Sequence, residues 1–174
     1  EMCIRDRAKC LNEDDWKAVR RDLDLRPVEG VTGSESDAGI LDKLAKFGIT
    51  PESVTLWGTG TPMREFLWSE EMADASVHVL LNVDFKDTYV TGSRDIRNCH
   101  INVGTGKEVS IREVAEIIMK EIGFKGILLW DSSKPDGTMR KLTDVSKLHS
   151  LGWHHKVEID EGIERLYKWY LKGV

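Results

Sequence analysis

The stretch "SVTLWGTGTPMREF", residues 53–66, decides the fold class of this chain. Its first five residues are mostly apolar or β-branched, which is typical of a short strand. Gly58 and Gly60 follow at once, and a strand end with such permissive backbone can approach a ligand closely. The stretch therefore predicts a strand that runs into either a ligand-binding loop or an ordinary turn.

The loop does not match the two common phosphate-binding motifs. A G-x-G-x-x-G dinucleotide fingerprint needs glycine where Met63 stands, and no Gly-Lys-Ser/Thr follows. Arg64 could offer its planar guanidinium to a phosphate, and Trp57 could stack on a base or ribose. The alternative is a turn with a surface arginine and a core tryptophan, and the local sequence leaves both interpretations open.

Outward from this stretch, predicted strands and helices alternate, which indicates an α/β fold. A short helix is predicted before Pro27, and another ends at Gly48 with Ser36 or Asp37 as its cap. Further strands are predicted at "CHINVG" (99–104) and "GILLWD" (126–131). The strands are few and short, so we interpret the chain as part of a larger α/β protein.

Four more helices are predicted from caps and apolar spacing. One begins at Ser69, one follows a capping box made by Ser110 and Glu113, and a short one is capped by Asp144. The last helix begins near Asp160. Three of these helices carry predicted apolar stripes: Met72, Ala75, Ser76 and Val79 in the first, Ile111, Val114, Ala115 and Ile118 in the second, and Ile163, Leu166, Tyr167 and Tyr170 in the last.

Composition excludes several function classes. The chain has 174 residues, 40% of them hydrophobic and 32% charged, and a net charge of −5, which argues against nucleic-acid binding. No apolar run approaches the ~20 residues of a membrane span. The cysteines (Cys3, Cys10 and Cys99) are odd in number and, like the histidines, lack metal-ligand spacing. We expect no metal, no membrane partner and a cytoplasmic location with free thiols.

A second candidate loop follows the predicted strand at 126–131. "SSKPDGTMRKLT", residues 132–143, brings together Lys134, Asp136, Arg140 and Lys141. The basic groups suit a diphosphate, and the carboxylate could accept hydrogen bonds from ribose hydroxyls. The alternative is a solvated charged loop. Two such loops after strand ends favour ligand binding, because α/β ligands bind beyond the carboxyl ends of strands. By contrast, "NVGTG" (102–106) is explained as a turn before a capped helix.

No catalytic residue is predicted. A reductase tyrosine needs a lysine one helical turn further on to lower the pKa of its phenol. Tyr89 is followed at that spacing by Ser93, and Tyr167 by Leu171. No nucleophile elbow is present either.

Three blocks together carry a family resemblance: "LWGTGTPMREFLWSEEMADA", "HINVGTGKEVSIREVAEII" and "SKPDGTMRKLTDVSKLHSLGW". The chain resembles the carboxyl-terminal part of the GDP-L-fucose synthases, which are extended short-chain dehydrogenase/reductases, from about Ala8 to Leu171. The resemblance implies that residues 8–174 form a GDP-sugar-binding domain that lacks the Rossmann half. Residues 1–7 are interpreted as a foreign leader.

The resemblance also implies an activity. The family converts GDP-4-keto-6-deoxy-D-mannose to GDP-L-fucose by epimerisation at C3 and C5 and reduction of the C4 ketone with NADPH. It holds NADP and its catalytic residues in the amino-terminal half, and the complete enzyme forms homodimers. We therefore expect this chain alone to bind no cofactor, to show no turnover and to expose apolar surface.

By the same resemblance, the substrate-binding residues are Trp57, Arg64, Asp136 and Lys141. Trp57 and Arg64 are expected to contact the GDP moiety, Arg64 through the diphosphate. Asp136 and Lys141 match the second nucleotide contact, and Arg140 could share the role of Lys141. Two alternatives stay open: a related epimerase or dehydratase acting on another nucleotide sugar, and a non-catalytic nucleotide-sugar-binding module.

Overall fold

The computed structural model describes residues 2–90, 92 and 96–172. They form two compact units. Unit 1 comprises the chain up to Pro62, then Ile111–Gly137, then Ile163 onward; unit 2 comprises Met63–Ser110 and Thr138–Gly162. The predicted domain, residues 8–174, is therefore two units, each described here by itself.

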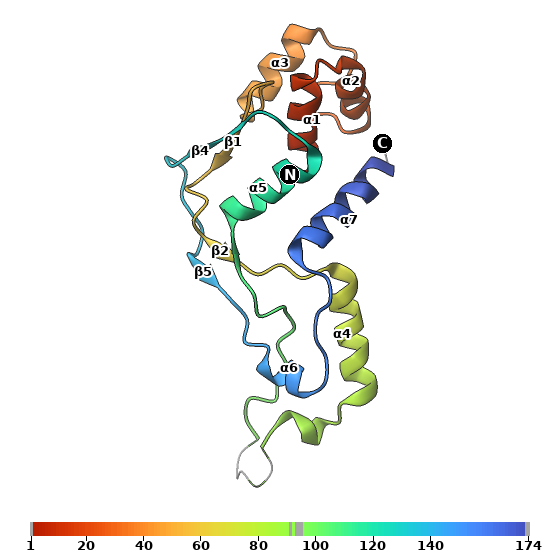
Figure 1. The fold of residues 1–174 in the computed structure, drawn as a ribbon, viewed down its shortest axis with the longest axis vertical. Helices are drawn as coiled ribbons and strands as arrows, with labels where there is room; N and C mark the ends of the chain where they lie inside the picture. Colours follow the sequence, from red (N-terminus) through yellow and green to blue (C-terminus); the bar gives the residue numbers. More distant parts are fainter. Residues whose placement is uncertain (1, 91, 93–95, 173–174) are drawn as a thin grey trace. The chain divides into compact units, whose positions relative to one another are not determined.

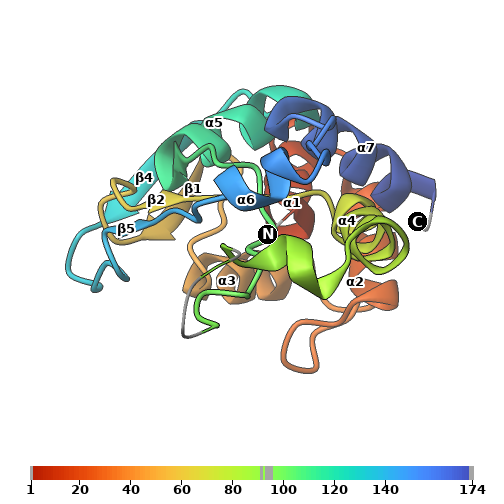
Figure 2. The same ribbon diagram turned by 90° about the horizontal axis from the view of Figure 1, so that it is seen from below.

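Unit 1 is built around a parallel pair of strands, β1 (Ser53–Trp57) and β4 (Ile127–Asp131). Ser53 pairs with Ile127 at one end and Trp57 with Asp131 at the other. The two strands lie side by side in both views (Figures 1 and 2). Because the strands are parallel, the loops that follow Trp57 and Asp131 leave from the same edge.

The helices of unit 1 surround this pair. They are α1 (Met2–Asn12), α2 (Trp16–Leu25), α3 (Asp37–Lys46), α5 (Ile111–Ile122) and the part of α7 (Ile159–Lys172) from Ile163 onward. Fully buried side chains from α2, α3, β1 and α5 form the core, namely Val19, Leu23, Ile40, Leu44, Val54 and Ile122.

Sequence-based expectations for unit 1 are largely confirmed. The Ser36 hydroxyl accepts the Gly39 amide at 3.1 Å, so Ser36 caps α3, and Gly48 follows the helix with a φ of +73°. On α7, Ile163, Tyr167 and Tyr170 are buried as predicted, but Leu166 is 43% exposed.

The amino-terminal helix differs from the prediction. Two helices stand where one was expected, because Asp14 adopts a φ of +57° and Asp15 caps α2 by accepting the Ala18 amide. The boundary predicted between residues 7 and 8 lies inside α1. Arg7 is buried in unit 1 and pairs with Asp22.

Unit 2 contains a small sheet in the order β3-β2-β5, formed by Val109–Ser110, Met63–Arg64 and Arg140–Lys141. Its helices are α4 (Ser69–Asn82), the 3-10 helix η1 (Phe85–Thr88) and α6 (Ser146–Ser150). Ala75, Leu148 and Trp153 form the core, and the Trp153 indole donates to Asp74 at 2.8 Å.

The strand predicted at 99–104 is wrong. Residues 99–104 form no strand, although Ile101 and Val103 pack against the core of unit 2. A side chain distant in sequence binds this backbone: the Lys147 ammonium donates to the His100 carbonyl and to that of Asn98, just before the stretch. An apolar segment can therefore be anchored to a core without a β-ladder partner.

Two details of α4 also differ from the prediction. Trp68, not Ser69, occupies the cap position, and it provides no side-chain capping bond. Of the predicted stripe, Ala75 is buried but Met72 is 45% exposed. Apolar side chains that are at least half exposed lie on the same helix, as expected from the resemblance: Val77, Leu80 and Leu81.

Candidate functional site

The loop after β1 is held in place by its own glycines. Gly58 and Gly60 both have positive φ values, +77° and +76°. A Cβ atom on Gly58 would overlap Oδ1 of Asp136, and one on Gly60 would lie 2.6 Å from the ring of Trp130. Both glycines are therefore needed for backbone shape and for close packing.

Asp136 is bound to this loop. Its Oδ1 accepts the Thr59 amide at 2.9 Å, and its Oδ2 accepts the Thr59 hydroxyl at 2.7 Å. These bonds, first from the hydroxyl and then from the amide, hold the pKa of Asp136 below its usual value. Each carboxylate oxygen has a second lone-pair site, so Asp136 can still accept a bond from a ligand.

Three backbone amides of the loop are directed to protein groups. Gly58 donates to the Asp131 carbonyl at 2.9 Å, Thr59 to Asp136, and Thr61 to the Thr59 hydroxyl at 3.2 Å. A phosphate cradle needs such amides pointing at the ligand. The geometry agrees with the missing third glycine: this loop is not a dinucleotide phosphate loop.

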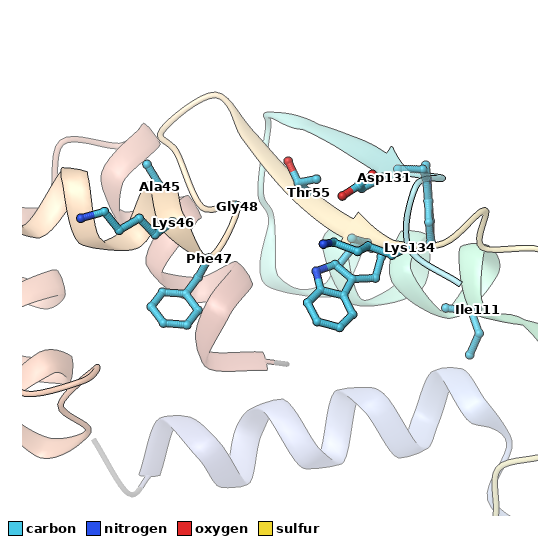
Figure 3. Close-up of a pocket in the computed structure, with 11 residues that line it drawn as sticks. Ala45, Lys46, Phe47, Gly48, Thr55, Ile111, Asp131 and Lys134 are labelled. Atoms are coloured by element: carbon cyan, nitrogen blue, oxygen red, sulfur yellow. The ribbon is translucent and has the colours of Figure 1, made fainter. Parts of the chain in front are cut away.

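Trp57 is not a core residue. The residue is 74% exposed, which contradicts the interpretation of a core tryptophan within this chain. It lines a pocket of about 730 Å³ in unit 1, together with the end of α3 and both strands. Figure 3 shows Ala45–Gly48 on the helix side of this pocket and Thr55, Asp131 and Lys134 on the strand side. The Lys134 ammonium lies 5.4 Å from the Trp57 ring centroid.

In unit 2, Arg64 and Lys141 are neighbours across the sheet. They are register partners in the parallel pairing of β2 with β5. Paired residues on adjacent strands, about 4.8 Å apart, point to the same face of a sheet. Two positive side chains therefore share one face of this sheet.

The guanidinium of Arg64 is fixed at one end only. Its Nη1 donates to the carbonyls of Met63 and Thr138, both at 2.6 Å. Nη1 is the only Arg64 nitrogen with a recorded bond to the described residues, so the fork retains donors for an anion.

The side chains of Lys141 and Arg140 differ in whether they are available to bind an anion. Arg140 Nε donates to both carboxylate oxygens of Glu108, at 2.7 and 3.0 Å. Lys141 is exposed, and its ammonium makes no hydrogen bond or ion pair with the described residues. The geometry favours Lys141 over Arg140 as an anion contact.

Glu65, which sequence reasoning missed, organises unit 2 next to Arg64. Its Oε1 accepts the amides of Thr105 at 2.6 Å and Gly106 at 2.7 Å, and its Oε2 accepts the Thr143 amide at 3.1 Å. Burial acts to raise the pKa of Glu65, but the bonds from Thr143, Gly106 and Thr105 outweigh it, so the pKa is lowered. The loop at 102–106 thus receives a carboxylate from the protein, in agreement with its interpretation as structural.

Other side-chain chemistry is sparse in the described part of the chain. No group of three or more His, Cys, Asp or Glu residues there could hold a metal ion. Cys10 and Cys99 are free thiols, and burial raises the pKa of Cys10 to about 11. None of the described helices is long and apolar enough to cross a membrane.

Comparison with known proteins places this geometry in a family. Residues 25–104 match the model of the NAD dependent epimerase/dehydratase family. The chain is 46% identical over 120 residues to the GDP-L-fucose synthase of Escherichia coli (strain K12), which covers 69% of this chain. The chain belongs to the NAD dependent epimerase/dehydratase family. This match confirms the resemblance drawn from the sequence.

Further relatives support the same family assignment. The chain is 50% identical over 123 residues, 71% of its length, to GDP-L-fucose synthase 1 of Arabidopsis thaliana. It spans about a third of the length of these curated relatives, 36% and 34% respectively. A GDP-D-glycero-L-gluco-heptose synthase from Campylobacter jejuni, solved in the presence of NADPH, superposes with a TM-score of 0.81 at 37% identity; the match covers 98% of this chain and 45% of that one. The α/β fold expected from the sequence is that of the family.

Proposed function

We propose that this chain provides the GDP-sugar contacts of a GDP-L-fucose synthase. The observation that carries the proposal is the pairing of Arg64 with Lys141 across β2 and β5. A diphosphate carries two negative charges, and a hydrogen bond to a charged group contributes ~1.5–3 kcal/mol. Two cations on one sheet face, one of them a partly anchored guanidinium, suit such a ligand.

Trp57 and Asp136 are proposed to contact the nucleoside. The exposed Trp57 ring offers a flat apolar surface on which a base or ribose can stack. Asp136 keeps acceptor capacity for ribose hydroxyls while it holds Thr59. Trp57 and Asp136 belong to unit 1 and Arg64 and Lys141 to unit 2, so these assignments rest on the local chemistry of each residue and on the family resemblance.

The complete enzyme is proposed to make GDP-L-fucose from GDP-4-keto-6-deoxy-D-mannose by 3,5-epimerisation and 4-reduction with NADPH. The loop after β1 lacks the arrangement of an NADP phosphate cradle, since the amides of Gly58, Thr59 and Thr61 donate to protein groups. We propose that residues outside this chain bind NADP and carry the catalytic groups, and that this chain alone shows no turnover. Homodimer formation by the complete enzyme stays a prediction, and the free thiols suit a cytoplasmic location.

A second candidate is favoured by the similarity to a GDP-heptose synthase. In this second function the substrate has the same GDP moiety but a different sugar, and neither Arg64 nor Lys141 would distinguish the two sugars. Calorimetric titration of this chain with GDP, UDP and inorganic pyrophosphate tests the shared part of the proposal. We expect GDP to bind, and pyrophosphate to bind more weakly because it lacks the nucleoside. If GDP does not bind, or if UDP binds as tightly as GDP, the assignment is wrong.

A further inference from the structure

Arg112, in the first turn of α5, holds the backbone of the loop after β1. Its Nη2 donates to the Thr59 carbonyl at 2.7 Å, and its own amide donates to the Gly60 carbonyl at 2.9 Å. The neighbouring Ile111 amide donates to the Pro62 carbonyl at 3.0 Å. Amides in the first turn of a helix have no partner inside the helix, and here two of them bind this loop.

Trp130 on β4 orients the Arg112 side chain. The guanidinium carbon of Arg112 lies 4.5 Å from the Trp130 ring centroid, which is stacking distance for a planar cation on an aromatic face. The same ring packs so closely against Gly60 that a Cβ there would lie 2.6 Å away. Trp130 therefore contacts the loop directly and also supports the arginine that binds it.

Thr59 is bonded from two directions as a result. Asp136 accepts its amide and its hydroxyl, whereas Arg112 donates to its carbonyl. Arg112 lies on α5 and Asp136 in the loop after β4, both in unit 1. Together they fix both peptide groups of Thr59, two residues after Trp57.

We infer that Arg112, stacked on Trp130, is a positioning residue that sets the orientation of the loop carrying Trp57 for nucleotide binding. The inference rests on the proposed function, because it requires Trp57 to contact the nucleotide. Arg112 acts through Thr59 and Gly60 and does not itself bind phosphate. A lysine cannot replace it fully, since an ammonium lacks the planar face that stacks on Trp130.

The test uses the full chain and the variants Arg112→Ala, Arg112→Lys and Trp130→Leu, with Arg21→Ala on an exposed face of α2 as the matched control. Two quantities are measured: hydrogen exchange of the Thr59 amide without ligand, and the Kd of GDP at several salt concentrations. Loss of one hydrogen bond predicts roughly fivefold faster Thr59 exchange and roughly fivefold weaker GDP binding in Arg112→Ala. The slope of log Kd against log salt should stay unchanged, because no phosphate contact is lost.

Arg112→Lys should change Thr59 exchange and the Kd of GDP less than Arg112→Ala does. Trp130→Leu should change both about as much as Arg112→Ala. The control Arg21→Ala should change neither. Unchanged Thr59 exchange in Arg112→Ala, with normal GDP binding by the unsubstituted chain, overturns the positioning role alone. A reduced salt slope overturns it in favour of direct phosphate binding. Absence of GDP binding by the unsubstituted chain overturns it together with the proposed function. If Arg112→Ala does not fold, Arg112→Lys and Trp130→Leu decide by the same criteria.

Discussion

Thr59 and Asp136, 77 positions apart in the sequence, are joined by two hydrogen bonds of 2.9 and 2.7 Å. This pair connects the two stretches that the sequence marks as candidate ligand loops, one after β1 and one after β4. The parallel pairing of these strands brings both loops to one edge. The carboxylate thus has a structural task besides the nucleoside contact proposed for it.

The Thr59–Asp136 pair should make the loop sensitive to acid. The folded-state pKa of Asp136 lies below its usual value. The carboxylate therefore stabilises the loop fully above the unfolded pKa of about 3.9, and this contribution is lost as the pH falls through the lower folded-state pKa. We expect protection of the Thr59 amide against exchange, corrected for the intrinsic rate, to be constant between pH 7 and pH 5 and to fall below about pH 4. Asp136→Asn should lower protection at neutral pH and abolish its fall in acid, and an acid response retained in that variant would contradict the assignment.

Gly58→Ala should destabilise unit 1 in two ways. A left-handed backbone costs a non-glycine residue roughly 1–2 kcal/mol, and the added Cβ would displace Asp136. Gly30→Ala is the matched control, since Gly30 has a φ of +84° and no atom lies within 4 Å of the methyl group that the substitution would add. We expect both variants to lose unfolding free energy in urea, with Gly58→Ala losing more. Equal losses would show that Asp136 makes no difference at this position.

Glu65→Gln should destabilise unit 2 without touching the proposed ligand contacts. An amide side chain has one acceptor oxygen, so it cannot accept the amides of Thr105 and Gly106 at one oxygen and that of Thr143 at the other. Bonds to a charged acceptor contribute ~1.5–3 kcal/mol, and partial exposure reduces the expected loss to about 1 kcal/mol. Because the pKa of Glu65 is lowered, the stabilisation is present above the unfolded pKa of about 4.3 and is lost as the pH falls through the lower folded-state pKa. Urea denaturation at neutral pH and at about pH 3 checks this, and a variant as stable as the unsubstituted chain at neutral pH would contradict it.

Trp57→Ala should weaken GDP binding without lowering the stability of the fold. The ring is 74% exposed, so its removal should leave the midpoint of urea denaturation nearly unchanged. A stacked base is worth about 1–3 kcal/mol by alanine substitution, which predicts GDP binding weakened by roughly 5- to 150-fold. Trp57→Phe should retain most of the affinity. A large loss of stability with unchanged GDP affinity would instead support a packing role.

The sequence predicted what depends on local chemistry. The strands at 53–57 and 127–131 followed from β-branched and apolar runs, and the cap at Ser36 from its hydroxyl. It failed where non-local contacts decide. Residues 99–104 have strand-like composition, but the His100 carbonyl accepts a hydrogen bond from Lys147, 47 residues away.

In the candidate site, too, the sequence predicted the residue types but not the contacts between residues distant in sequence. Arg64 and Lys141 were selected by residue type and motif, but only the β2–β5 pairing makes them neighbours. The roles of Glu65 and Arg112 depend on amides and carbonyls distant in sequence, which no spacing rule encodes. The carboxylate and guanidinium of those residues gave no local signal beyond that of an ordinary charged side chain.

The central claim, that Arg64 and Lys141 bind the diphosphate of a GDP-sugar, is tested most directly by titrating GDP into Lys141→Ala. The Lys141 ammonium makes no hydrogen bond or ion pair with the described residues, so truncating this side chain should not disturb the fold. Loss of a charged contact of about 1.5 kcal/mol predicts roughly tenfold weaker GDP binding and a shallower salt dependence, whereas Lys125→Ala, at an exposed lysine, should match the unsubstituted chain. Equal GDP affinity in Lys141→Ala and Lys125→Ala would contradict the account.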